Sequence, residues 1–268
     1  KQFREEISPY FNSKSKKYLA ALISDECWQA TPGKVVDLIR NIGIAAGGTV
    51  MEDCRVIEAV RDGKYTSVLV STHDKQYIEY RTEHFVNALG SGAGKLCDSM
   101  GIDAGLYPVR HQAFITRRLP MLGKNGANLD MLIDRQDYKG FSAVYGQQIA
   151  YTGQIIGCAS PKLDAMRIDK NLKLNTKAFL EIVSEMFVEW IPDLAGVGIQ
   201  AVWAGYYTEP RYIVDPELGL FVGMRGHGFM LSQYIAKMYV DKLMGRPVPE
   251  YFDKLKLNGP GLSEKAFK

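Results

Sequence analysis

The sequence has no apolar run long enough to cross a membrane. Nowhere in its 268 residues do apolar side chains approach the roughly 20 in succession that a spanning helix needs, and the first residues carry no hydrophobic signal core. Neither sign of charge dominates, since 33 basic and 30 acidic side chains give a formal net charge of +3. Because these charges are interspersed, we expect neither membrane insertion nor a nucleic-acid-binding surface.

Cysteine and histidine are scarce. The four cysteines are far apart and form no C-x-x-C pair, which is typical of reduced, mostly buried thiols in a cytoplasmic protein. His84 and His111 lie in or beside predicted strands without a Cys, Asp or Glu cluster at ligand spacing, so we expect no metal site. The cysteines are Cys27, Cys54, Cys97 and Cys158.

Several catalytic signatures are also missing. The chain has no G-x-S-x-G nucleophile elbow, no H-E-x-x-H zinc motif and no P-loop. Hydrolase, zinc-protease and phosphotransferase chemistries therefore have no support. The composition is that of a globular protein, and at 46% hydrophobic residues it suffices for one large or two closely packed domains.

An amphipathic helix is predicted from Pro32. Thr31 supplies an N-cap, Pro32 occupies the first helical position, and Gly47 and Gly48 end the pattern. The apolar side chains that share one face of this helix are Val35, Leu38, Ile39 and Ile42.

Short β-rich runs make up most of the remaining pattern. The first three predict an antiparallel meander, and the fourth predicts a buried strand that enters a glycine-rich turn and a helix over 95–100. A later helix carries an apolar stripe that predicts core packing, and 248–268 is predicted to be a surface tail. The strands are predicted at 55–61, 66–71, 76–81, 84–88, 108–116, within 131–156, at 200–207 and at 218–222, and the stripe is Phe179, Ile182, Val183, Met186, Phe187 and Trp190.

A second glycine-rich turn, residues 223–230, joins a predicted strand to a predicted helix. Gly223, Gly226 and Gly228 let the backbone approach a ligand closely, and the amides at a helix N-terminus favour negative charge. By itself such a cluster is typical of an ordinary turn, but it also suits an electron-rich ligand.

Five features are specific when taken together in order and spacing. They are Trp28-x-x-x-Pro32 with its helix ending at Gly47-Gly48, the strand containing Val56, Val86-Asn-Ala-x-Gly90, Pro108-x-Arg-x-Gln112, and Trp203-Ala-Gly205 followed by Gly226-His-Gly-Phe229. This series resembles the D-amino-acid oxidase and sarcosine (glycine) oxidase superfamily of FAD-dependent oxidoreductases. The family's N-terminal G-x-G-x-x-G unit is absent, so the sequence resembles the C-terminal two-thirds of such an enzyme.

The resemblance implies a mixed α/β (α+β) fold. We expect an FAD/NAD(P)-binding-like domain that lacks its N-terminal βαβ unit, interleaved with a mixed-sheet substrate-binding domain. Since the first residues look like the middle of a protein, we also expect an upstream portion. The expected boundaries are 1–30 for a partial linker or helical region, 31–104 and 212–247 for the incomplete FAD-binding domain, 105–211 for the substrate-binding domain and 248–268 for the C-terminal tail.

The resemblance also implies where FAD binds. The backbone at Val56 would lie near the adenine, Ala88 and Gly90 would lie along the cofactor, and the second glycine turn would face the flavin ring. There the amides and the helix dipole would stabilise negative charge that develops on the flavin during reduction. No cysteine lies where sarcosine oxidases tether flavin, so non-covalent FAD is expected. The turn residues assigned to the cofactor are Gly223, Gly226, Gly228, Phe229 and Met230.

Substrate recognition is where the sequence departs from the family pattern. Many amino-acid-oxidising relatives carry an arginine after the tryptophan-containing strand, which pairs with the substrate carboxylate. Here Arg211, Arg225 and Arg110 are the candidates. Arg225 stands where a small residue is usual, and contact with solvent or with a partner subunit is its alternative interpretation.

Further candidates come from the same comparison. His227 is assigned, with Arg225, to the catalytic centre, although a histidine in a glycine turn is also commonly a structural donor. Tyr145, Tyr206 and Tyr207 are candidate pocket residues, although strand tyrosines are commonly half-buried sheet residues.

We therefore expect an FAD-dependent amine or amino-acid dehydrogenase or oxidase. In this interpretation hydride passes from the carbon next to the amine nitrogen to flavin N5, and oxygen or a redox partner reoxidises the flavin. Two alternatives stay open: a non-catalytic or assembly subunit of a heteromeric flavoprotein, and a flavoenzyme that oxidises hydroxy acids.

Overall fold

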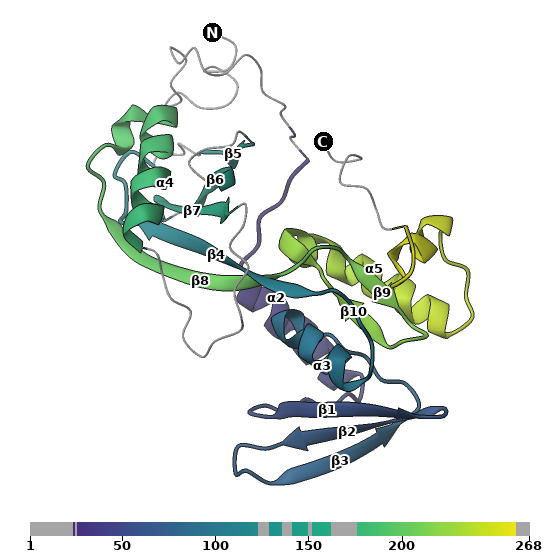
Figure 1. Cartoon of the computed structure of the whole chain (residues 1–268). Coiled ribbons are helices and arrows are strands. Elements are labelled where there is room, and N and C mark those ends of the chain that lie inside the picture. The colour runs from purple at the N-terminus through teal and green to yellow at the C-terminus, as the bar shows by residue number, and fades with distance from the viewer. Residues whose placement is uncertain are drawn as a thin grey trace. The chain divides into compact units, whose positions relative to one another are not determined.

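The chain divides into two units, whose helices and strands are labelled in Figure 1. The structure, a computed structural model, describes residue 24 and residues 26–122, 129–135, 141–149, 152–161 and 176–260. Unit 1 comprises Lys1–Ser24 and Val109–Tyr206, and unit 2 comprises Asp25–Pro108 and Tyr207–Lys268. Most of the region predicted over 1–30 lies outside the described residues, and the expected domain boundaries stay a prediction.

Unit 1 is built on a five-stranded sheet in the order β5-β6-β7-β4-β8, of which residues 107–108 of β4 and 207–209 of β8 belong to unit 2. Strands β5, β6 and β7 form an antiparallel series, and β7 pairs antiparallel with β4. The unit also contains helix α4 and the short helix η2. Their bounds are β4 Tyr107–Thr116, β5 Leu132–Asp134, β6 Phe141–Ile149, β7 Gln154–Pro161, α4 Thr176–Trp190, η2 Pro192–Leu194 and β8 Ile199–Glu209.

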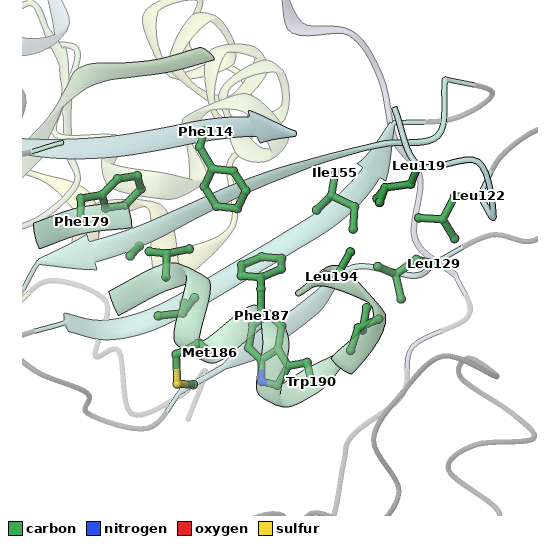
Figure 2. Close-up of a cluster of buried hydrophobic side chains, with 14 residues drawn as sticks. Phe114, Leu119, Leu122, Leu129, Ile155, Phe179, Met186, Phe187, Trp190 and Leu194 are labelled. Atoms are coloured by element: carbon green, nitrogen blue, oxygen red, sulfur yellow. The ribbon is translucent and has the colours of Figure 1, made fainter. Parts of the chain in front are cut away.

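The core of unit 1 lies between this sheet and α4 (Figure 2). Phe187 of α4 meets Phe114 of β4 edge to face, with ring centroids 5.3 Å apart. It can approach the sheet because Gly146 and Gly157, paired across β6 and β7, have no side chain there: a Cβ on Gly146 would lie 2.2 Å from the Phe187 ring. The predicted α4 stripe is thus confirmed as core packing.

Unit 2 begins with helix α2 (Pro32–Ala45), as predicted. Its apolar face does not join a core, because no residue of Pro32–Ala45 is buried and the side chains of Leu38 and Ile42 are 58% and 60% exposed. The proline at the first position of the helix and the glycines after it are the local signals that allow its start and its end to be predicted.

The predicted meander is confirmed in unit 2. Strands β1 (Arg55–Asp62), β2 (Tyr65–Ser71) and β3 (Tyr77–Thr82) form an antiparallel sheet in the order β1-β2-β3, with an irregular register between Val56 and Glu58. One face packs against helix α3 (Ala93–Ser99).

The buried strand predicted over 84–88 is wrong. Among the described residues, its pairing reduces to one parallel bridge between Asn87 and Leu220 of β10 (Leu220–Val222), which forms a hairpin with β9 (Ile213–Asp215). The strand stops there because the Asn87 side chain accepts a hydrogen bond from Leu89 N and turns the chain into the short helix η1 (Gly90–Gly92).

The surface tail predicted from residue 248 is also wrong over its described part. Helix α5 (Gly228–Leu243) is followed by the short helix η4 (Glu250–Leu255). Its residues Phe252 and Leu255, three apart on one face, are 0% and 2% exposed and pack in the cluster that contains Ile235 of α5. The end of the described chain is therefore part of the core of unit 2.

Candidate functional site

Two glycine-rich turns of unit 2 follow the two segments that are joined by the parallel bridge between Asn87 and Leu220 of β10. Asn87 N donates to the carbonyl of Gly219 (2.8 Å), and Phe221 N donates to the carbonyl of Asn87 (3.0 Å). Because both segments run in the same direction through this bridge, the turn after Asn87 and the turn after β10 start on the same side of it. One turn leads to α3 and the other to α5. In open α/β sheets, ligands bind where parallel strands end.

The first turn is built by Asn87, a fully buried residue that sequence analysis did not assign to the site. Its Nδ2 donates to the carbonyl of Ala93 (3.1 Å), and its Oδ1 accepts from Leu89 N (3.2 Å). Gly90 has a φ of 55°, and a Cβ there would meet nothing within 4 Å. The backbone conformation therefore favours glycine at position 90, in a turn where Ala88 is exposed.

The second turn is packed against the segment that links β8 to β9. At Gly223 the φ is 73°, and a Cβ would lie 1.9 Å from the carbonyl oxygen of Arg211. At Gly226 a Cβ would lie 2.9 Å from the Tyr207 ring. The chain then enters the short helix η3 (Arg225–His227) and α5. Glycine at position 223 lets two backbone segments touch, and glycine at position 226 leaves room for the Tyr207 ring.

Two side-chain contacts join this linking segment to the turn. Glu209 Oε2 lies 2.5 Å from Nε of Arg225, and these side chains are only 16% and 22% exposed. The hydroxyl of Tyr212 lies 2.5 Å from Nδ1 of His227. Arg225 and His227 are predicted site residues, whereas their partners Glu209 and Tyr212 are not, because no sequence motif marks them.

The N-terminus of α5 carries no negative charge of its own. His227 is its N-cap residue, no side chain caps it, and its first turn contains no acidic residue. The amides and the dipole of a 16-residue helix therefore point positive charge at this end. Phe229 and Met230, in the same turn, are 48% and 67% exposed.

Of the predicted substrate residues, Arg110, Tyr145 and Tyr206 belong to unit 1. Arg110 and Tyr206 are half-buried. Tyr145 in β6 forms a side-chain hydrogen bond to Cys158, and burial of that thiol raises its pKa to about 11. The Tyr145 side chain therefore contacts a neighbouring strand within the sheet of unit 1.

The other predicted residues belong to unit 2. Tyr207 packs against Gly226, and the Arg211 guanidinium donates to the carbonyls of Leu257 and Gly259. Arg211 therefore ties the segment after η4 to the β8–β9 link. Val56, expected near adenine, is half-buried in β1 beside the register shift, in the cluster that α3 covers.

Among the described residues, no three or more His, Cys, Asp or Glu side chains form a group suited to a metal ion. No helix in the described part of the chain is long and apolar enough to span a membrane.

The sequence model of the FAD dependent oxidoreductase family matches residues 3–242. The chain belongs to this family. A comparison with curated proteins found no match.

Several solved structures share the fold of this chain. L-proline dehydrogenase from P. horikoshii matches with a TM-score of 0.66 and 23% identity, over 84% of this chain and 59% of that one. Glycine oxidase from Geobacillus kaustophilus matches with a TM-score of 0.56 and 18% identity, over 80% and 54% of the two chains. Glycerol-3-phosphate dehydrogenase from Bacillus halodurans, solved with FAD, matches with a TM-score of 0.54 and 13% identity, over 84% and 45%.

These structures confirm the predicted mixed α/β fold, and the family model confirms the predicted family. The chain spans about six-tenths or less of the length of these structures.

Proposed function

We propose that the protein oxidises the C–N bond of an amino acid or a secondary amine with non-covalently bound FAD. The observation that carries this proposal is the parallel bridge between Asn87 and Leu220, on one side of which two glycine turns start in a member of the FAD dependent oxidoreductase family. Proteins that share the fold include a proline dehydrogenase and a glycine oxidase, which supports an amine substrate.

The residues of these turns fit a flavin. The first turn of α5 has no acidic side chain, and its N-terminal amides suit the electron-rich carbonyl end of the ring. Gly226 and Gly228 add no side chains to this turn, and Ala88 and Gly90 are exposed residues of the neighbouring turn. When bound, FAD supplies the hydride acceptor for oxidation of the carbon next to the amine nitrogen, and the imine product hydrolyses in water.

The chain's own residues would bind and orient the substrate. We assign Arg225 to the substrate carboxylate, which would exchange with the carboxylate of Glu209 as the partner of the guanidinium. His227, held at the N-terminus of α5, would donate a hydrogen bond to flavin or substrate. Arg110, Tyr145, Tyr206 and Tyr207 stay candidate pocket residues, whereas Arg211 is engaged by two backbone carbonyls.

Cofactor and substrate would be bound by different parts of the chain. In this proposal residues 31–104 and 212–247 contribute the FAD-binding part, and 105–211 the substrate-binding part. An electron acceptor, either oxygen or a redox partner, completes the cycle.

A non-catalytic or assembly subunit of a heteromeric flavoprotein is the second candidate. The observation that favours it is the apolar face of α2, where Leu38, Ile39 and Ile42 are 58%, 46% and 60% exposed. Exposed apolar side chains grouped on one helix face are typical of a contact surface. An enzyme that oxidises hydroxy acids is the other chemical alternative.

The experiment is a substrate screen under anaerobic conditions after incubation with FAD. Amino acids, secondary amines and hydroxy acids are added in turn, and loss of the oxidised flavin absorbance reports reduction. Bleaching by amines alone supports the proposal, and bleaching by hydroxy acids alone replaces it with the chemical alternative. A protein that takes up no FAD and copurifies with a second polypeptide would favour the assembly subunit.

A matched pair of variants tests the flavin assignment. Met230 is 67% exposed in the first turn of α5, so its replacement changes charge without changing the core. Met230→Glu places a negative charge where the flavin would become negative on reduction, and Met230→Gln is its neutral control. We expect the rate of flavin reduction to fall about tenfold in the first variant and to stay within about twofold in the second. Equal rates of flavin reduction in the two variants would show that the flavin ring does not bind at this turn.

A further inference from the structure

We propose that Tyr212 is a positioning residue for His227 and fixes its neutral imidazole with the proton on Nε2. The Tyr212 hydroxyl lies 2.5 Å from Nδ1 of His227, and the ring centroids are 6.2 Å apart with planes inclined by 50°. A neutral imidazole has one donor nitrogen and one acceptor nitrogen. Because a phenol donates readily, Nδ1 accepts and Nε2 keeps the proton.

Tyr212 is well placed for this task because its own position is fixed on both sides. It is half-buried and packs against the core cluster of Val214, Ile235 and Met238. The residue after it, Ile213, is fully buried and pairs with Val222 in the β9–β10 hairpin. An exposed histidine is thus held by a side chain that belongs to the core.

The place of His227 gives this bond a consequence. His227 is the N-cap residue of α5, at the end of the turn that also carries Arg225. The charge of Arg225 is paired with Glu209, so the nearest formal charges on this turn balance each other. With its tautomer fixed, His227 presents an Nε2–H donor to an acceptor atom of a ligand. This consequence rests on the proposed function, whereas the tautomer itself does not.

The first test needs no flavin. The full 268-residue chain is labelled with ¹⁵N-histidine, and the four imidazoles are observed by long-range ¹H–¹⁵N correlation spectroscopy. His227→Gln identifies the resonances of His227. We expect the Nε2–H tautomer in the wild type, and a ratio of tautomers about fivefold closer to unity in Tyr212→Phe, as loss of one hydrogen bond predicts. A wild-type His227 in the Nδ1–H form, or a ratio unchanged in Tyr212→Phe, would overturn the proposal.

A control separates this effect from a general effect of removing a hydroxyl. Tyr77 in β3 is 68% exposed and belongs to the same unit. We expect Tyr77→Phe to leave the His227 spectrum unchanged. A change of equal size in Tyr77→Phe would show that the response is not local and would overturn the proposal.

The second test uses the FAD-loaded protein and a substrate that bleaches the flavin. We expect Tyr212→Phe to lower kcat/KM about fivefold with an unchanged FAD content, and to have no further effect in a His227→Gln background, since the two residues act as one unit. Additive effects would overturn the proposal. A chain that takes up no FAD would instead overturn the proposed function, and the tautomer measurement would still decide the role of Tyr212.

Discussion

Glu209 and Arg225 form an ion pair within unit 2, with Oε2 and Nε 2.5 Å apart. Arg225 has a φ of 49°, a conformation that costs a residue other than glycine on the order of 1 kcal/mol. The carboxylate therefore holds an arginine in a strained position at the end of the turn that leads into α5. Backbone strain at Arg225 therefore indicates that this residue has a function beyond forming the turn.

The first prediction concerns the ligand of Arg225. Arg225→Ala should raise KM for a carboxylate substrate about tenfold, because one charge-assisted hydrogen bond is lost, and should leave the FAD dissociation constant within about twofold. Steady-state kinetics and an FAD titration check both values. An unchanged KM with lost FAD would show that Arg225 serves the cofactor.

Glu209→Gln is the matched variant for the same prediction. It keeps Arg225 but removes the carboxylate that competes with the substrate for the guanidinium. We expect KM for the carboxylate substrate to fall, since the substrate no longer displaces a charged partner. A rise in KM as large as that of Arg225→Ala would mean that the pair supports the site only by its structure.

The second prediction concerns the close approach at Gly223. A Cβ at this position would lie 1.9 Å from the carbonyl oxygen of Arg211, whereas a Cβ at Gly245 would meet nothing within 4 Å. Both glycines have a positive φ, 73° and 68°, so their replacement by alanine carries similar backbone strain. We expect Gly245→Ala to lower the free energy of unfolding by about 1 kcal/mol and Gly223→Ala by at least about 3 kcal/mol. Equal losses in urea unfolding would contradict this contact.

Elements with strong local signals could be predicted from the sequence. Helix α2 has a proline at its start and glycines after it, and the stripe of α4 repeats at helical spacing. The β1–β3 meander has Asp62-Gly63 as a hairpin turn. These patterns depend on nearby residues, so they can be recognised in the sequence without knowledge of the tertiary contacts.

What the sequence could not predict depends on contacts between distant segments. In place of the strand predicted over 84–88 the structure has only the bridge at Asn87, because the buried Asn87 side chain turns the backbone away. The spacing of apolar residues in the sequence does not reveal this contact. Phe252 and Leu255 lie in the predicted tail, but they are buried in the structure because they pack against α5.

The candidate site follows the same division. Its glycines were visible, because positive φ and close approach select glycine. Glu209 and Tyr212 could not be predicted as site residues, because they contact residues about 15 positions away in the sequence.

The third prediction concerns Asp241 near the end of α5. Its carboxylate accepts hydrogen bonds from Lys237 and Arg246, and the bond from Lys237, more than that from Arg246, lowers the pKa of Asp241 below its usual value. Because the folded pKa is depressed, the unfolded chain takes up the proton first as pH falls. The contribution to stability is therefore present above about pH 4 and lost below it.

Urea unfolding at several pH values checks this sign. Asp241→Asn should be less stable than the wild type at pH 7, and the difference should shrink as pH falls from about 5 to 3. Asp74→Asn, in the exposed turn between β2 and β3, is the control and should follow the wild type. A difference between Asp241→Asn and the wild type that is independent of pH would mean that the aspartate acts through packing and not through its charge.

The last prediction concerns the order in which the cysteines react. Cys27 is exposed, Cys54 is half-buried, and Cys97 and Cys158 are buried. Burial raises the pKa of Cys97, and it raises that of Cys158 to about 11, so at pH 8 only roughly one Cys158 in a thousand is the reactive thiolate. A thiol reagent such as DTNB should therefore react quickly with Cys27 and slowly with Cys54, and with the other two only after unfolding.

Two variants assign these phases. Cys27→Ser should remove the fast phase, and Cys158→Ser should leave the reaction of the folded protein unchanged while removing one equivalent after unfolding. Four equal rates in the folded protein would contradict the burial of Cys97 and Cys158. Because Cys158 is hydrogen-bonded to Tyr145, a reactive Cys158 would also contradict the position of Tyr145 in the sheet of unit 1.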